Sequence, residues 1–322
     1  MSRKRHTPIA RSLDRAPASP PVAQEADAPR PKEPGVDPTT RLLRQRVARL
    51  FRDLPLAVAG EPEPVHQMRV AARRLRVALA LLARRPGGKR VRRAARLVRD
   101  LTRGGGTSRD LDVITTLLEG RLGEAPSAEL KTLVRDLRAA RARSRRRMAA
   151  DLLDVDIAGL RRDLKAVLAR RGVPAATAVR RLGAAAARDE AGALEALDAL
   201  GETFDPARLH RIRIHFRRLR YTAELADALG GRDSAAPALF RGVQVSVGSL
   251  HDAFVLSGWL ERKAARAEAA GRGDLARCAR AERDRALEQA HAHHREFLAL
   301  DPRALLARGI AAMAASRSAA YR

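Results

Sequence analysis

Apolar residues recur every three or four positions along most of the chain from residue 38 onward, which is the spacing of amphipathic helices. Asp37, Asp205 and Asp301 are each followed by a proline, and a capping carboxylate before proline is typical of a first helical turn. Glycine and proline breaks then predict helices over about 38–55, the stretch before Pro86, 89–103, from 109, 128–153, 157–171, 175–200, 206–229, 235–248, from 252, 274–300 and from 302.

One stretch of this pattern occurs twice. The segment 66–76 returns 144 positions later as 210–220, with His, Arg, Arg-Arg, Leu and Arg in the same places. On a helix the histidine and most of the arginines share one face, opposite a row of apolar residues, while Arg74 and Arg218 lie about 80° from their histidines. The basic positions are His66, Arg69, Arg73, Arg74 and Arg76 in the first copy, and His210, Arg213, Arg217, Arg218 and Arg220 in the second.

A second basic stripe follows on the next predicted helix. Its members are spaced by three and four residues: Lys89, Arg92, Arg96, Arg99 and Arg103. Two successive helices with basic ridges either point to solvent in different directions or line one groove, and the pattern allows both. Further candidates for the same basic surface are Arg109, Arg135, Arg138 and Arg241.

The composition of the chain predicts an all-α fold class and a polyanionic partner. Ala, Leu and Arg dominate, aromatic residues make up only 3%, and the net charge is +27. Of the 64 basic residues 58 are Arg, whose planar fork engages two phosphate oxygens at once. Residues 1–171 hold 40 basic and 19 acidic residues, against 24 and 18 in the remainder, so we expect the first half to contribute more binding energy.

The first copy, from Val65 to Arg76, resembles the signature helix of the CHAD family, the conserved histidine α-helical domain. The second copy, ending at Tyr221, is similar to that family's second signature, and the strings at 106–113 and 248–255 fit the same pattern. The resemblance covers roughly residues 38–300. It implies two pseudo-symmetric, antiparallel helical bundles whose basic helices converge on a central cavity that binds inorganic polyphosphate, with association with polyphosphate granules.

The chain departs from that family pattern in two places, and two acidic residues have two interpretations. A triple glycine at 104–106 replaces bulkier residues, so a looser turn is expected, and His251 stands where the first half has Arg109. Asp110 and Asp252 either complement a helix dipole or orient a neighbouring Arg or His of the cavity.

The expected organisation has four parts. Residues 1–37 are a proline-rich, basic, disordered tail, and residues 38–171 form the first bundle. Residues 172–300 form the second bundle, and residues 301–322 form a C-terminal helical extension. Oligomeric state is left open.

Several classes of function are not expected. The single Cys278 excludes an intramolecular disulfide, and we expect no membrane span, no secretory leader and a cytoplasmic location. There is no glycine-rich phosphate loop and no His-Glu-x-x-His pair, so neither catalysis nor a cofactor is expected. No metal is expected at His291, His293 and His294, which we assign to a solvated face. We assign His215 to packing.

Two alternatives to polyphosphate binding stay open. Non-specific nucleic-acid binding follows from the charge, although one Trp, two Tyr and six Phe offer few stacking platforms. The other is a structural or scaffold protein whose basic stripes only keep it in solution. For the polyphosphate hypothesis, phosphates around His66 and His210 would stabilise their imidazolium forms and tighten binding as the pH falls.

Overall fold

A computed structural model describes residues 36–104, 106–201 and 204–319, and within these ranges the chain forms helices and no strand. The all-α fold class is therefore confirmed. All but the last two residues of the predicted tail lie outside the described residues. The helices are α1 (Pro38–Val58), α2 (Pro62–Leu82), α3 (Lys89–Gly104), α4 (Gly106–Glu124), α5 (Ala128–Leu153), α6 (Ile157–Leu168), α7 (Ala175–Leu200), α8 (Pro206–Gly230), α9 (Ala236–Ala269), α10 (Gly273–Ala299) and α11 (Pro302–Ala319).

Capping aspartates start three of these helices, as predicted. Asp37 accepts a hydrogen bond from the backbone N–H of Thr40 at 2.9 Å, and Asp205 accepts from the backbone N–H groups of residues 207 and 208. Asp301 accepts from the N–H of Ala304 at 3.0 Å. Each carboxylate satisfies donors that the first helical turn leaves without a partner.

A helix boundary predicted in the second half is not present in the described chain. The helices expected at 235–248 and from 252 are one continuous helix, α9, which runs through the buried Gly248. In the first half, α3 ends at Gly104 and α4 begins at Gly106. The looser turn expected at 104–106 includes residue 105, which lies outside the described residues. Ser108, just before the predicted helix start at 109, lies inside α4 and is buried.

Residues from Asp37 onward form one compact unit with two apolar cores. The larger core takes side chains from most of the helices, including α1, α2, α7, α8 and α11. The smaller core is built by α4 and α5 from the first half and by α9 and α10 from the second. The boundary predicted at residue 171 therefore does not divide either core, and the internal duplication stays a prediction.

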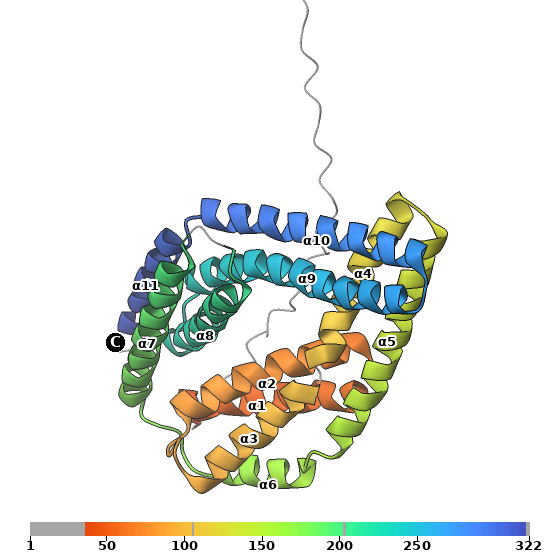
Figure 1. Ribbon diagram of the computed structural model, residues 1–322. Helices are drawn as coiled ribbons and strands as arrows, with labels where there is room; N and C mark the ends of the chain where they lie inside the picture. The colour runs from red at the N-terminus through yellow and green to blue at the C-terminus, as the bar shows by residue number, and fades with distance from the viewer. Residues whose placement is uncertain (1–35, 105, 202–203, 320–322) are drawn as a thin grey trace, which may run out of the picture. The chain divides into compact units, whose positions relative to one another are not determined.

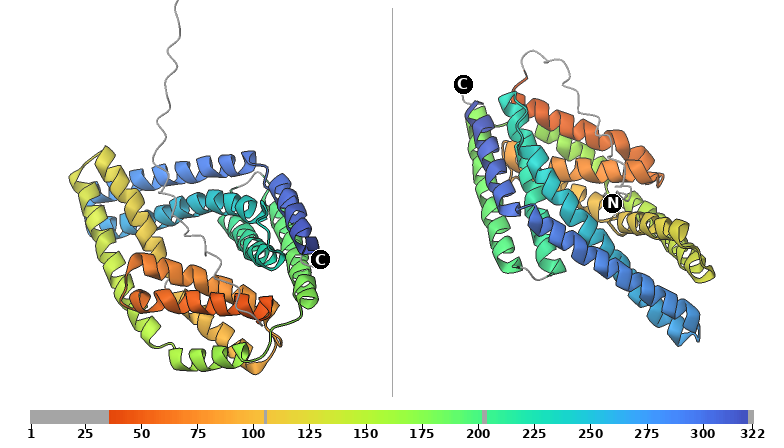
Figure 2. Two further views of the ribbon diagram at one scale, coloured as in Figure 1. Left: turned by 180° about the vertical axis from the view of Figure 1, so that it is seen from behind. Right: turned by 90° about the horizontal axis from the view of Figure 1, so that it is seen from above.

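The packing brings the two repeated segments together. Figures 1 and 2 show α9 and α10 side by side, and α1 beside α2. The repeated segments lie on α2 and α8, which contact each other, while α4 contacts both α2 and α9. None of the described helices is long and apolar enough to cross a membrane.

Candidate functional site

The apolar faces of α2 and α8 fix the direction of their basic faces. On α2, Met68 and Leu75 are completely buried, and on α8 the equivalent Ile212 and Leu219 are completely buried. Because these positions have the same phase in both copies, the arginines between them emerge on equivalent sides of the two helices.

Arg69 of α2 lies where the two copies meet. Its side chain is buried, and its Nη1 donates a hydrogen bond to the carbonyl of Thr102 near the end of α3. Burial, together with the nearby charges of Arg73, Arg217 and Arg109, lowers the pKa of Arg69 to about 10, although Asp110 opposes them. A guanidinium of one copy therefore lies within electrostatic reach of a guanidinium of the other.

Arg73 of α2 and Arg217 of α8 also lie where the two copies meet. Burial is the largest cause that lowers the pKa of Arg73; Arg213 lowers it further, while Tyr221, whose hydroxyl accepts a hydrogen bond from Arg73, opposes the shift. Burial likewise lowers the pKa of Arg217 to about 10, with Arg73 as the strongest neighbouring charge. The neighbours of Arg76 include Arg99 and Arg218. We call the following set the basic cluster: Arg69, Arg73, Arg76, Arg99, Arg109, Arg213, Arg217 and Arg218.

Three histidines border the basic cluster. Burial and the positive charge of Arg109 lower the pKa of His66 to about 4, against a weaker opposing effect of Glu63. Burial and Arg213 also lower the pKa values of His210 and His251, whose ring centroids lie 6.3 Å apart. The imidazole of His66 is therefore neutral at pH 7 in the ligand-free protein.

Carboxylates near the basic cluster do not neutralise it. Asp252 is mostly buried, and burial together with the charge of Asp110 raises its pKa to about 6 against the opposing charges of Arg213 and Arg109. The charge of Asp110 also opposes the lowering of the pKa values of Arg69 and Arg73. In the described part of the chain, no carboxylate forms an ion pair with Arg69, Arg73, Arg76, Arg99, Arg109, Arg213 or Arg217.

Two predicted ligands, Arg74 and Arg220, share a carboxylate partner. Arg74 Nε lies 2.7 Å from Glu224 Oε2, and Arg220 Nε lies 3.2 Å from the other oxygen of the same carboxylate. Their guanidinium groups also lie over the ring of Tyr221, at 5.7 and 5.3 Å from its centroid. The mostly buried carboxylate of Glu224 thus links Arg74 of α2 to Arg220 of α8, and the assignment of both arginines as ligands stays a prediction. Arg218 is only partly available, since it lies 3.4 Å from Asp189.

Within the described residues, no hydrogen bond or ion pair joins the outer candidates to the basic cluster. On α3, Lys89, Arg92, Arg96 and Arg103 are exposed, and Arg92 donates to the carbonyl of Gly87. Arg135 and Arg138 of α5 are exposed and pair with Asp136 and Glu119, respectively, and Arg241 is half-buried on α9. Of the second stripe, Arg99 lies close enough to Arg76 to lower its pKa, which places it in the basic cluster.

Sequence reasoning missed the roles of Tyr221 and Glu224. Each lies four residues after a basic position of the second copy, Arg217 and Arg220, and this spacing places them on the same helix face. That signal was present in the sequence. His215, assigned to packing, also lies with its Nδ1 3.0 Å from Asp189.

Two cavities lie away from the basic cluster. One, of about 390 Å³, lies between α5 and α9, and the other, of about 490 Å³, lies between α1 and α6. No residue of the basic cluster lines either, so a central cavity stays a prediction. Among the described residues, no group of three or more His, Cys, Asp or Glu is arranged to hold a metal ion.

The chain is similar to a known protein family and to a solved structure. The family model for the CHAD domain matches residues 41–261, a range that contains the whole basic cluster. The chain belongs to the CHAD domain family. This CHAD domain is similar to the crystal structure of the CHAD domain from the plant Ricinus communis, with a TM-score of 0.60, 24% identity and coverage of 84% of this chain and 90% of that one. A search of curated proteins found no match. At this identity the likeness to the plant structure shows the fold alone.

Proposed function

We propose that this CHAD domain binds inorganic polyphosphate at the basic cluster and does not transform it. The proposal rests on one observation. Arg69 and Arg73 of α2 lie near Arg213 and Arg217 of α8, and no carboxylate of the described residues forms an ion pair with them. A linear polymer with a negative charge on each phosphate complements such a row of guanidinium groups. Each planar fork is able to donate two parallel hydrogen bonds to one phosphate.

The electrostatic state of the basic cluster supports a polyanion rather than a small anion. Arg73 and Arg217 are largely buried and each lowers the pKa of a neighbouring arginine, which means that their charges repel one another. Folding alone does not offset this repulsion, whereas several linked phosphates offset it at several positions at once. Counterion release adds to the affinity, which should therefore fall steeply with salt.

The aromatic residue nearest to the basic cluster argues against single-stranded nucleic acid. Tyr221 is only 4% exposed, with Arg74 and Arg220 over its ring. A dedicated single-strand site combines basic side chains with accessible rings on which bases stack, and Tyr221 cannot serve as such a platform.

A competition experiment tests the proposal. Labelled long-chain polyphosphate is bound to the protein at about 150 mM salt, where screening suppresses loose surface contacts. Unlabelled polyphosphate and duplex DNA of equal phosphate content then compete. We expect polyphosphate to displace the label at a much lower phosphate concentration than DNA does. Equal competition per phosphate would leave only non-specific attraction to charge and defeat the proposal.

We also propose that the protein resides in the cytoplasm on polyphosphate granules, since its affinity for the polymer would retain it there. A fluorescent fusion should co-localise with the granules, and the variant Arg73→Ala with Arg217→Ala should be diffuse. A wild-type fusion that stays diffuse in granule-containing cells would contradict this.

A further inference from the structure

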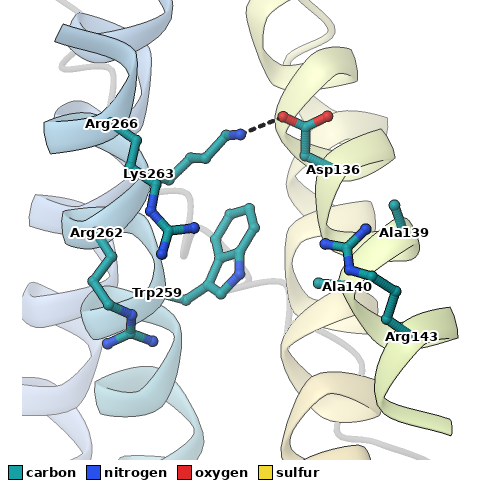
Figure 3. Close-up of a pocket in the computed structure, with 8 residues that line it drawn as sticks. All are labelled: Asp136, Ala139, Ala140, Arg143, Trp259, Arg262, Lys263 and Arg266. Carbon is teal, nitrogen blue, oxygen red and sulfur yellow. Dashed lines mark ion pairs between the residues drawn. The ribbon is translucent and has the colours of Figure 1, made fainter. Parts of the chain in front are cut away.

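The cavity between α5 and α9 has a chemistry different from that of the basic cluster. Its volume is about 390 Å³, within the range of small-molecule sites. Helix α9 contributes Trp259, Lys263 and Arg266, and α5 contributes Arg143 and Asp136. Figure 3 shows the indole of Trp259 in the space between the two helices, with the guanidinium groups of Arg143 and Arg266 on either side of it, while Arg262 points away.

Positive charge in this cavity is only partly compensated. Lys263 forms an ion pair with Asp136, as the dashed line in Figure 3 marks. Burial would raise the pKa of the Asp136 carboxyl, but the hydrogen bond and charge of Lys263, with Arg135 next, lower it below its ordinary value. Within the described ranges no carboxylate pairs with Arg143 or Arg266. Two guanidinium groups are therefore available to an anion.

The indole ring of Trp259 gives the cavity a stacking surface, which a phosphate group alone would not contact. Trp259 is half-buried, packs against the smaller core and is the single tryptophan of the chain. Opposite it, Ala139 and Ala140 line the α5 wall with small side chains. A planar ring that stacks on the indole would thus have room between the helices, and stacking of a base on an aromatic side chain is typically worth a five-fold gain in affinity or more, about 1–3 kcal/mol.

We propose that this cavity is a second ligand site, which binds one nucleoside polyphosphate. The base stacks on Trp259, and the phosphates receive hydrogen bonds from Arg143 and Arg266. The Asp136 carboxylate, held by Lys263, accepts from a hydroxyl or amino group of the nucleoside. A single ring in a cavity of this size matches one nucleotide rather than a strand, which requires successive stacking positions. The site does not depend on polyphosphate binding at the basic cluster.

Fluorescence provides a direct test, because all tryptophan emission comes from Trp259. The full chain is titrated with ATP, inorganic tripolyphosphate and adenosine, each without divalent cations, at about 150 mM salt. We expect ATP to change the emission saturably with one molecule bound per chain. Tripolyphosphate and adenosine should each bind at least about five-fold more weakly, because each lacks one of the two recognised groups. Equal affinity for ATP and tripolyphosphate would reduce the cavity to a simple anion site and overturn the proposal.

Variants locate the site. Arg143→Ala with Arg266→Ala should weaken ATP binding at least ten-fold, whereas the matched pair Arg147→Ala with Arg308→Ala, exposed arginines outside the cavity, should not. Equal losses would mean that only net charge matters. Calorimetry on Trp259→Leu and Trp259→Phe completes the test, with circular dichroism to confirm folding. Phenylalanine should restore most of the affinity that leucine loses, and equal affinity of the two would also overturn the proposal.

Discussion

Arg74 Nε lies 2.7 Å from a carboxylate oxygen of Glu224, a residue 150 positions further along the chain. The same carboxylate receives Arg220 at 3.2 Å and Arg46 at 3.9 Å. This arrangement ties α1, α2 and α8 together beside the basic cluster. It separates the arginines of the repeated segments into some that hold the helices and others that are free to meet an anion.

The first prediction concerns Glu224→Ala. Removal of this carboxylate leaves three guanidinium groups uncompensated in a mostly buried place, so we expect a loss of about 3–5 kcal/mol in the free energy of unfolding. Urea denaturation measures it, with the exposed Glu195→Ala as control. A loss no greater than that of the control would show that the carboxylate does not hold α2 to α8.

Glu224 also contributes to the pH dependence of stability. Burial would raise its pKa, but Arg74 and then Arg220 lower it below the ordinary 4.5. A carboxylate with a lowered folded-state pKa contributes stability that is present above the unfolded-state pKa and is lost as the pH falls through the folded-state value. Wild-type protein should therefore lose stability below about pH 4.5 more steeply than Glu224→Gln does. Parallel acid-denaturation curves would contradict this.

A second prediction sets stability against binding at Arg217. This guanidinium is largely buried, repelled by Arg73 and Arg213, and without a carboxylate partner in the described chain. Arg217→Gln should therefore raise the free energy of unfolding by about 0.5–2 kcal/mol and weaken polyphosphate binding. Thermal denaturation and binding isotherms on the same preparation measure both. A destabilised variant would show that Arg217 serves the fold.

The third prediction is that polyphosphate binds more tightly as the pH falls from 7 to 5. In the free protein the pKa of His66 is about 4, through burial and the charges of Arg109, Arg73 and Arg69, opposed by Glu63. A bound polyanion raises that pKa, so binding takes up a proton. The buried Asp252, with a pKa of about 6, loses its negative charge over the same interval.

Variants separate the two contributions to this pH dependence. His66→Gln should flatten the increase in affinity toward pH 5, and Asp252→Asn should remove the part centred near pH 6. Polyphosphate-binding isotherms of the wild type and both variants, measured at steps of half a pH unit, test these expectations. Affinity that is constant from pH 7 to 5 in the wild type would contradict the proposed contact between the phosphates and His66.

The sequence predicted the helices well, because period and caps are local signals. The boundaries of α5 and α7 agree with the predicted ranges to the residue, and the capping aspartates start their helices. It missed the continuity of α9, because the effect of one glycine depends on packing. It did not reveal the carboxylate partner that Arg74 and Arg220 share, since that partner depends on tertiary contact between α2 and α8.

The same distinction applies to the second stripe. Spacing placed five basic residues on one face of α3, but only the position of α2 and α8 decides which of them comes near other cations. Arg99 comes near another cation, Arg76. Helical periodicity gives a direction around one axis, whereas a site on several helices depends on how those axes cross.

The most direct test of the account is the stoichiometry of a short phosphate oligomer, measured by titration calorimetry in the presence of saturating ATP to occupy the α5–α9 cavity. If the two repeated segments form one site, one oligomer binds per chain, and Arg73→Ala on α2 and Arg217→Ala on α8 each weaken that single event by about ten-fold or more. The pair Arg147→Ala with Arg308→Ala should leave it nearly unchanged. Two oligomers per chain, with each variant abolishing one of them, would contradict a shared site.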